Sequence, residues 1–157
     1  MKSHELKSLQ TLRQLREQRA SAQLAAQRQL CRETHAALDD ARQRLCLARE
    51  TSALEAEKLY GRFSEGLSVK AWLAAQVHLS ELEDEQETLL GNLDEAHDYH
   101  QQQEQTQESL RQAHVARQRQ ADAWDSLVED HALGERRIGE AQDEGEDLFA
   151  PLLDLTP

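Results

Sequence analysis

Residues 72–96, which read WLAAQVHLSELEDEQETLLGNLDEA, decide the fold of this chain, because their apolar residues recur at alternating intervals of three and four. The same spacing continues to residue 138, and twelve of the 20 positions on it are apolar. This spacing is typical of a helix that packs along one narrow seam against another helix. The predicted seam of this helix consists of Trp72, Ala75, Leu79, Leu82, Gln86, Leu89, Leu93, Ala96, His100, Gln103, Gln107, Leu110, His114, Arg117, Ala121, Trp124, Val128, His131, Glu135 and Ile138.

The composition favours long helices over a globular core. Hydrophobic residues make up 38% of the 157 residues and aromatic residues only 4%, so little material is available for an interior. The two prolines are Pro151 and Pro157, and therefore no proline interrupts a helix in the first 150 residues. We expect the function to lie in surface contacts rather than in the chemistry of a pocket, and we expect no enzymatic activity.

The first segment, from residue 3 to residue 60, is predicted to form one helix with a seam of its own. At its start, Leu6, Leu9, Leu12 and Leu15 are spaced three apart, which is tighter than a heptad and leaves the register open there. The seam of the remainder is predicted to consist of Ala20, Leu24, Cys31, Leu38, Ala41, Leu45, Ala48, Ser52 and Leu59.

Residues 61–67 break the pattern and are predicted to be a turn, because Gly61 and Gly66 can end one helix and permit a reversal. Ser68 can cap the second helix, which is expected to extend over residues 68–138. Helices joined by a short connection fold back on each other, and this connection makes opposite positions sum to about 128. That register places Leu38 beside Leu89 and Leu93, Leu45 beside Leu82, Leu15 beside Leu110 and His114, and Leu6 near Trp124.

Charge is distributed unevenly along the chain, whose formal net charge is -12. Residues 1–50 carry ten Lys or Arg and six Asp or Glu, whereas residues 80–110 carry ten Asp or Glu and no Lys or Arg. This asymmetry suits a basic helix lying beside an acidic one. The alternative is two solvated faces that keep the protein soluble. The register above places five arginines alongside the acidic stretch: Arg19, Arg28, Arg32, Arg42 and Arg44.

The predicted fold is therefore all-α: an elongated antiparallel two-helix coiled-coil hairpin with a C-terminal helical overhang and a frayed acidic tail. Residues 1–145 are assigned to the hairpin, and residues 146–157 to an acidic and apolar tail that is expected to be flexible. The overhang is expected to begin beyond about residue 125, where the first helix has no more residues to pair. A competing interpretation is an assembly in which the second helix pairs with its own copy.

Motifs for chemistry are not found. The sequence has neither of the glycine-rich phosphate-binding loops, and no cofactor is predicted. His97 and His100, with Asp94 and Glu104 nearby, could ligate zinc, but His100 with Gln103 and Gln107 is better explained as a polar section of the seam; no metal is predicted. Cys31 and Cys46 are 15 residues apart and are expected to be reduced thiols.

The sequence also disfavours membrane insertion and nucleic-acid binding. No apolar run is long enough for a membrane span and the first residues lack the core of a signal peptide, so a cytoplasmic protein without direct membrane insertion is expected. The acidic half disfavours nucleic acid, and the basic half has no interleaved aromatic residues on which bases could stack.

Residues 66–90, GLSVKAWLAAQVHLSELEDEQETLL, carry a resemblance to a known family. Trp72, then Leu79 and Leu82 as a Leu-x-x-Leu pair, then Gln86, follow a glycine-containing reversal, and this arrangement resembles the YscO/FliJ family of stalk proteins of type III secretion and flagellar export. The likeness extends over the chain in architecture and over about 25 residues in detail. The Gln-rich and acidic second half favours the virulence-type, YscO-like branch.

The resemblance implies a non-enzymatic stalk at the base of a membrane-embedded secretion apparatus. Such a stalk inserts its helix termini into the hexameric secretion ATPase and contacts a membrane protein of the export gate, and secretion chaperones are a further possible partner. At the open end, Leu6, Leu9, Trp124, Val128 and Ile138 are the candidates for the ATPase. Near the turn, Tyr60, Phe63, Trp72 and Leu79 are the candidates for the gate. The alternative function is an adaptor or escort that binds chaperones or clients through its apolar stripe; a structural alternative for the aromatic residues is that they close the ends of the coiled coil.

Overall fold

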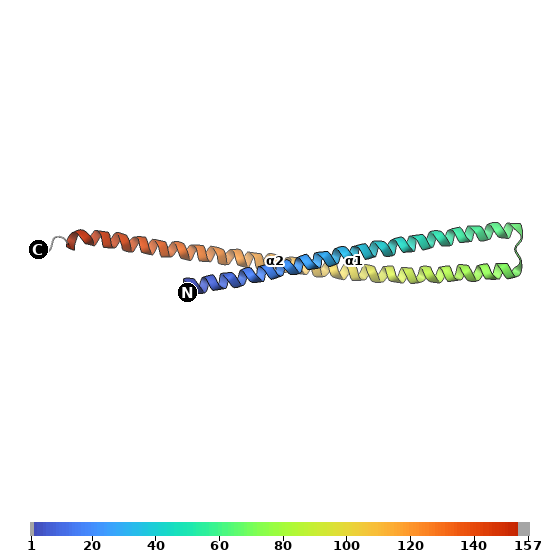
Figure 1. Cartoon of the computed structure of the whole chain (residues 1–157), viewed down its shortest axis with the longest axis horizontal. Helices are drawn as coiled ribbons and strands as arrows, with labels where there is room; N and C mark the ends of the chain where they lie inside the picture. The colour runs from blue at the N-terminus through green and yellow to red at the C-terminus, as the bar shows by residue number, and fades with distance from the viewer. Residues whose placement is uncertain (1, 154–157) are drawn as a thin grey trace. The chain divides into compact units, whose positions relative to one another are not determined.

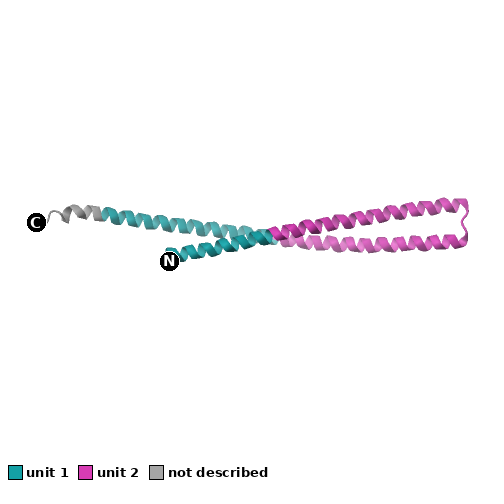
Figure 2. Cartoon of the chain, viewed as in Figure 1, with its two compact units in different colours: residues 1–24, 109–157 teal, residues 25–108 magenta. Residues whose placement is uncertain are grey.

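The computed structural model describes the backbone of residues 2–153 and the side chains of residues 2–145. It consists of two helices, α1 (Ser3–Glu65) and α2 (Val69–Leu153), with no strand in the described part. The chain divides into a turn unit, residues 25–108, and an open-end unit, residues 1–24 and 109–157 (Figure 2). In each unit α1 and α2 run side by side in opposite directions (Figure 1). The predicted all-α antiparallel two-helix fold is therefore confirmed.

The burial pattern confirms the predicted seams. On α2, the predicted positions from Trp72 to His131 are buried or half-buried with the exception of Arg117, while the residues between them are mostly exposed. The last two predicted positions, Glu135 and Ile138, are exposed, because α1 does not extend far enough to cover them. On α1, the largest residues of the predicted seam are buried: Leu24, Cys31, Leu38, Leu45 and Leu59. No described side chain is less than 2% exposed, because two helices alone cannot enclose a residue on all sides. The core is a single line of contacts.

In the first turns of α1, the buried side does not follow the leucines that are spaced three apart. Leu12 and Leu15 are 42% and 48% exposed, whereas Gln10, Arg13 and Glu17 are half-buried. A step of three residues rotates the side chain by about 300° around the helix, so three such steps in a row turn away from the partner. The heptad spacing, with polar residues on it, continues to the start of the helix.

The turn is shorter than expected and lies later in the sequence. Helix α1 continues through Gly61 to Glu65 rather than ending at residue 60, since one glycine costs a helix only about 1 kcal/mol. The reversal is made at Gly66, which has a φ of 92° and whose N–H donates to the carbonyl of Phe63 at 3.2 Å. Ser68 caps α2 as predicted: its Oγ accepts from the N–H of Ala71 at 3.2 Å.

The later turn shifts the register of the turn unit. Phe63 contacts Trp72 and Thr34 contacts His100, so these opposite positions sum to 135 and 134 rather than about 128. The predicted neighbours of Leu38 and Leu45 are displaced accordingly. Each seam nevertheless faces the other, because a shift of about one heptad returns apolar positions to apolar positions.

At the other end, α2 extends further than expected. It passes through Gly139 and Gly145 and ends at Leu153 rather than near residue 138. In the open-end unit the amide of Gln10 donates to the carboxylate of Asp125, so the first residues of α1 lie near residue 132 and the remainder of α2 is the overhang (Figure 1). The expected frayed tail, residues 146–157, lies outside the described side chains, and residues 154–157 lie outside the described backbone.

Candidate functional site

The open-end unit places three of its five candidate residues in the seam. Leu6 is 4% exposed, and Trp124 and Val128 are half-buried. The guanidinium carbon of Arg13 lies 5.9 Å from the centroid of the Trp124 ring, and Nη1 of Arg13 donates to Oε1 of Gln120 at 3.1 Å. These three candidates hold the two helices together and present little apolar area to a partner.

The end of α2 in this unit, from Leu127 into the overhang, carries exposed apolar side chains. Ile138 is 62% exposed, whereas Leu9 is half-buried at the edge of the seam. Leu127 and Leu133 are 51% and 41% exposed but are not among the candidates, because neither lies on the predicted seam of α2 from which the candidates of this helix were chosen. In the sequence, both can be recognised as apolar residues that do not lie on the heptad positions. The accessible candidate surface here consists of Leu127, Leu133 and Ile138.

The turn end of the turn unit presents two aromatic side chains to solvent. Tyr60 and Phe63 are 69% and 60% exposed. The Phe63 ring lies on Trp72, with centroids 5.2 Å apart and planes tilted by 48°, while Trp72 and Leu79 are half-buried in the seam. Phe63 and Trp72 are thus brought together, and Trp72 both closes the seam and supports an exposed ring.

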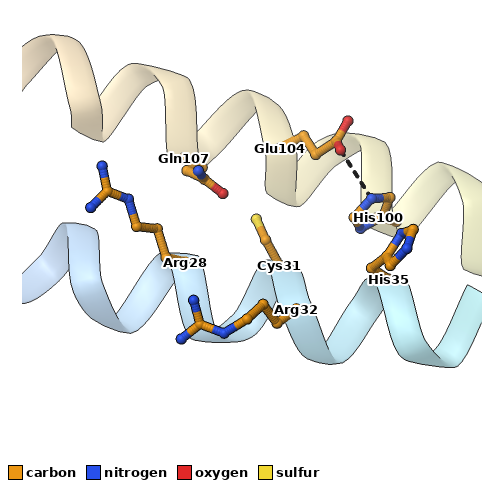
Figure 3. A pocket seen from close by; sticks show the side chains of 7 residues that line it. All are labelled: Arg28, Cys31, Arg32, His35, His100, Glu104 and Gln107. Carbon is orange, nitrogen blue, oxygen red and sulfur yellow. Dashed lines mark ion pairs between the residues drawn. The ribbon is translucent and has the colours of Figure 1, made fainter.

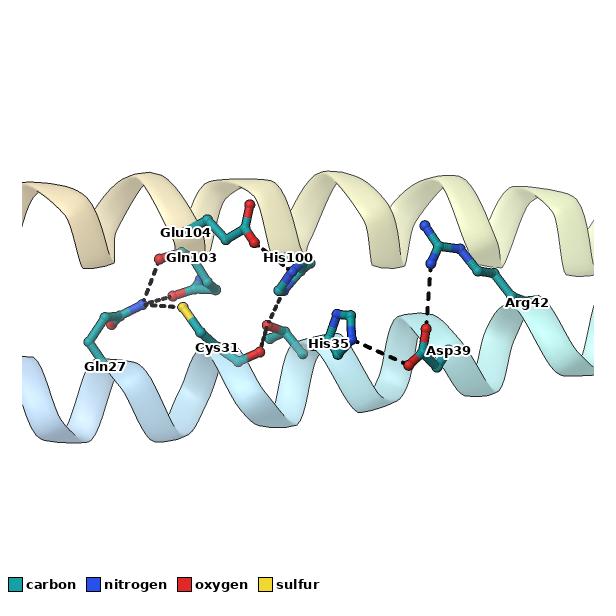
Figure 4. Close-up of polar contacts among 9 residues, drawn as sticks. Gln27, Cys31, His35, Asp39, Arg42, His100, Gln103 and Glu104 are labelled. Atoms are coloured by element: carbon teal, nitrogen blue, oxygen red, sulfur yellow. Dashed lines mark hydrogen bonds and ion pairs between the residues drawn. The ribbon is translucent and has the colours of Figure 1, made fainter.

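The polar section of the seam is held by hydrogen bonds between the helices (Figure 4). The hydroxyl of Thr34 donates to the carbonyl of Cys31 at 3.0 Å and therefore accepts from Nδ1 of His100 at 2.7 Å. Nε2 of His100 lies 3.0 Å from Oε1 of Glu104 on the next turn of α2. The side chain of His100 is 12% exposed, which confirms that this position faces α1.

A second polar pair lies in the same unit, three residues further along α2 and seven residues earlier in α1. Nε2 of Gln27 donates to Oε1 of Gln103 at 2.9 Å and to the carbonyl of Gln103 at 3.0 Å. Gln27 and Thr34 occupy heptad positions of α1 that the apolar pattern did not include, because both are polar. The polar section of the seam is therefore hydrogen-bonded between the two helices.

Beside this section lies an open groove of about 400 Å³ (Figure 3). One wall is formed by α1 and the other by His100, Glu104 and Gln107 of α2. Figure 3 shows Arg28 and Arg32 on the α1 wall with Cys31 between the helices. A similar groove further along the unit is lined by Arg42, Leu45, Cys46, Arg49, Glu50, Ala53 and Leu93.

In the turn unit, those basic residues of α1 that make a polar contact make it within their own helix. Arg42 contacts Asp39 at 3.4 Å and Arg44 contacts Asp40 at 3.0 Å, while both Nε and Nη2 of Arg32 donate to Gln29. Arg28 and Glu104 line one groove without an ion pair between them in the described structure. The expected charge match between the helices is thus not made by direct pairs between these arginines and the acidic stretch.

The described residues contain no group of three His, Cys, Asp or Glu that could hold a metal ion. His97 points to solvent beside Asp98, at 3.7 Å, whereas His100 lies in the seam, so the pair considered for zinc does not converge. In the open-end unit Nδ1 of His114 is buried without a hydrogen-bond partner, and Nε2 of His131 lies 3.2 Å from Glu135 without the alignment of a hydrogen bond. Over the part of the chain described, neither helix has a segment apolar enough to cross a membrane.

Comparison with known proteins adds no identification. No protein family, curated protein or solved structure matches this chain.

Proposed function

We propose that this chain is a non-enzymatic stalk subunit of a type III secretion apparatus, which acts at the cytoplasmic base of the apparatus. In this proposal the open end of the helix pair inserts into the hexameric secretion ATPase, and the turn contacts a membrane protein of the export gate. The resemblance of residues 66–90 to the YscO/FliJ family suggests these partners. Exposed apolar side chains at both ends of the helix pair support contacts with these two partners.

The overhang is the observation that carries the proposal. A single helix that continues past its partner can enter an opening too narrow for the pair, and Leu133 and Ile138 give it apolar side chains for the walls of that opening. At the turn, Tyr60 and Phe63 offer flat exposed rings, which are favoured at centres of protein interfaces.

The test is the turnover of the cognate ATPase with the purified chain added. The full chain is expected to raise both hexamerisation and turnover, and Ile138→Glu with Leu133→Glu is expected to abolish the increase while helix content is unchanged. The matched control is Leu47→Glu with Leu54→Glu, two exposed leucines of the turn unit that should leave stimulation intact. Lack of stimulation by the full chain at stoichiometric excess would count against the stalk function.

The second candidate function is an adaptor that binds secretion chaperones or their clients. It is favoured by the exposed Leu47 and Leu54, which are seven residues apart on one side of α1 and have no role in either end. The two functions predict opposite results for the same variants. For an adaptor, Leu47→Glu with Leu54→Glu should abolish chaperone binding, and the overhang variant should retain it.

A further inference from the structure

One side of the turn unit combines exposed charges with exposed apolar residues. On α1, Arg28, His35, Arg42 and Arg49 are seven residues apart, so they share one side of the helix, and Arg32 lies beside them on the same groove. We call these five residues the basic stripe. On α2, Glu83, Glu87, Asp94 and Glu104 follow the corresponding spacing and form the acidic stripe.

The two stripes border the same side of the helix pair. Arg28 and His35 of the basic stripe and Glu104 of the acidic stripe line one groove, as Figure 3 shows. Arg42 and Arg49 line the second groove on this side. Within the described structure Arg28 and Arg49 make no ion pair or hydrogen bond, and Glu83, Glu87 and Asp94 make no ion pair. The other basic-stripe residues have partners within α1: His35 and Arg42 contact Asp39, and Arg32 donates to Gln29.

Apolar residues continue the same side toward the turn. Phe63 lies on the heptad line of Arg49, and Tyr60 on that of Cys46; Leu90 lies on that of Glu83, and Leu73 on that of Glu87. All four apolar residues are exposed, from 42% for Leu90 to 69% for Tyr60. Exposed apolar side chains beside exposed charges are typical of a protein–protein contact.

We propose that this side is the contact surface for a second copy of the chain. A two-fold axis along the length of the turn unit lays α1 of one protomer on α2 of the other, antiparallel and in the same register as within one chain. The arginines of the basic stripe then lie over the acidic stripe of the partner. With opposite positions summing to about 134, as for Thr34 and His100, Arg42 lies over Asp94 and Arg49 lies over Glu87.

The apolar residues agree with the same arrangement. The register places Tyr60 and Phe63 of one protomer over Leu73 of the other, and Cys46 over Leu90. A two-fold axis across the unit would instead stack basic stripe on basic stripe, which like-charge repulsion disfavours. Charge and apolar surface therefore select one arrangement, a parallel pair of hairpins whose four helices form a bundle.

This inference does not rest on the proposed secretion function. The inference has one consequence for the proposed secretion function. The pair of chains would cover Tyr60 and Phe63, so self-association and binding of a gate protein through these rings would exclude each other.

The test uses the full chain and two charge-reversal variants. The first variant carries Arg42→Glu and Arg49→Glu, and the second carries Glu87→Arg and Asp94→Arg. In sedimentation velocity the unchanged chain is expected to reach twice the monomer mass with rising concentration, and the association should weaken at high ionic strength. Each variant alone is expected to remain monomeric, because it places like charges over each other. An equimolar mixture of the two should form a heterodimer, in which both charge contacts are restored.

The matched control carries Arg44→Glu and Lys58→Glu, which reverse two charges on the other side of α1 and should leave self-association unchanged. Circular dichroism of each variant verifies that the helices are retained. The proposal is overturned if the unchanged chain is monomeric at all concentrations, as it would be if this side served a different protein. It is equally overturned if the first variant dimerises as well as the unchanged chain, or if the mixed variants fail to associate.

Discussion

Nδ1 of His100 lies 2.7 Å from Oγ1 of Thr34, so the least apolar section of the seam is joined by a hydrogen bond between the two helices. The bond fixes the register at a point where apolar contacts alone would permit sliding, because a polar side chain slipped out of line loses its partner. Polar residues here have a positive role in specifying the fold.

The contribution of this bond can be measured with a double-mutant cycle. Thr34→Val and His100→Leu are each expected to change the free energy of unfolding, and about 1 kcal/mol of coupling between them should remain after both single effects are subtracted. Urea titrations followed by circular dichroism give the four values. Thr88→Val is the control, because the Thr88 hydroxyl donates only to the carbonyl of Asp84 in its own helix. Additive effects of Thr34→Val and His100→Leu would show that the two side chains are not in contact.

Changing His100, Gln103 and Gln107 together to leucine is expected to raise the melting temperature. Each leucine buried in the seam contributes about 1.5–3 kcal/mol, against about 1 kcal/mol for each hydrogen bond lost. Thr34 keeps its bond to the carbonyl of Cys31, and Gln27 keeps its bond to the backbone of Gln103, so neither α1 side chain is left unpaired.

The matched control for the triple change is leucine at the exposed positions Gln101, Gln102 and Gln105, which should leave the melting temperature nearly unchanged. An equal or lower melting temperature for the seam variant than for this control would contradict the placement of the three residues against α1.

The register of the open-end unit can be tested with cysteine pairs in a Cys31→Ser, Cys46→Ser background. A short bismaleimide is expected to join cysteines at Gln10 and Asp125 within one chain, because these side chains contact each other. The pair at Leu6 and Asp125 is offset by about one helical turn, about 5–6 Å along the axis, and should react more slowly. Mass spectrometry at low protein concentration separates products within one chain from products between chains. Faster reaction of the Leu6 pair would favour the register predicted from the sequence over the register of the structure.

The two cysteines should differ in their rate of modification. Cys46 is exposed, whereas Cys31 is 7% exposed in the seam, so a thiol reagent must wait for local opening of the helices to reach it. At low protein concentration, where the chain is monomeric, time-resolved mass spectrometry should show Cys46 labelled first, and the rates should become equal in denaturant. Labelling of Cys31 as fast as Cys46 in the folded chain would mean that the seam is open around Cys31.

The seam of α2 could be predicted from the sequence because heptad spacing alone determines which side of a helix is covered. The register could not be predicted, because it depends on where the turn lies, and the sequence does not distinguish Gly61 from Gly66 as the end of the first helix. Only Gly66 adopts a φ that favours glycine. The bonds of Thr34 and Gln27 were missed for a related reason: apolar periodicity does not detect polar residues that pair across a seam.

The exposure of the candidate residues was predicted less completely than the fold. Leu6, Trp124 and Val128 were selected because they are apolar and near an end, but apolar residues on the heptad are those that the partner helix covers. Leu127 and Leu133 are exposed because they lie off the heptad. For a chain of two helices, a binding surface is better sought among apolar residues that break the periodicity than among those that obey it.

Gly66 has a further consequence for how many molecules share one seam. With a side chain at this residue, the left-handed backbone would cost about 1–2 kcal/mol, which weakens the reversal relative to a single straight helix that continues from α1 into α2. The apolar strip of α1 would then be covered only by α2 of another chain, so two molecules would exchange halves. A single backbone torsion thus separates a self-contained hairpin from an exchanged pair built from the same contacts.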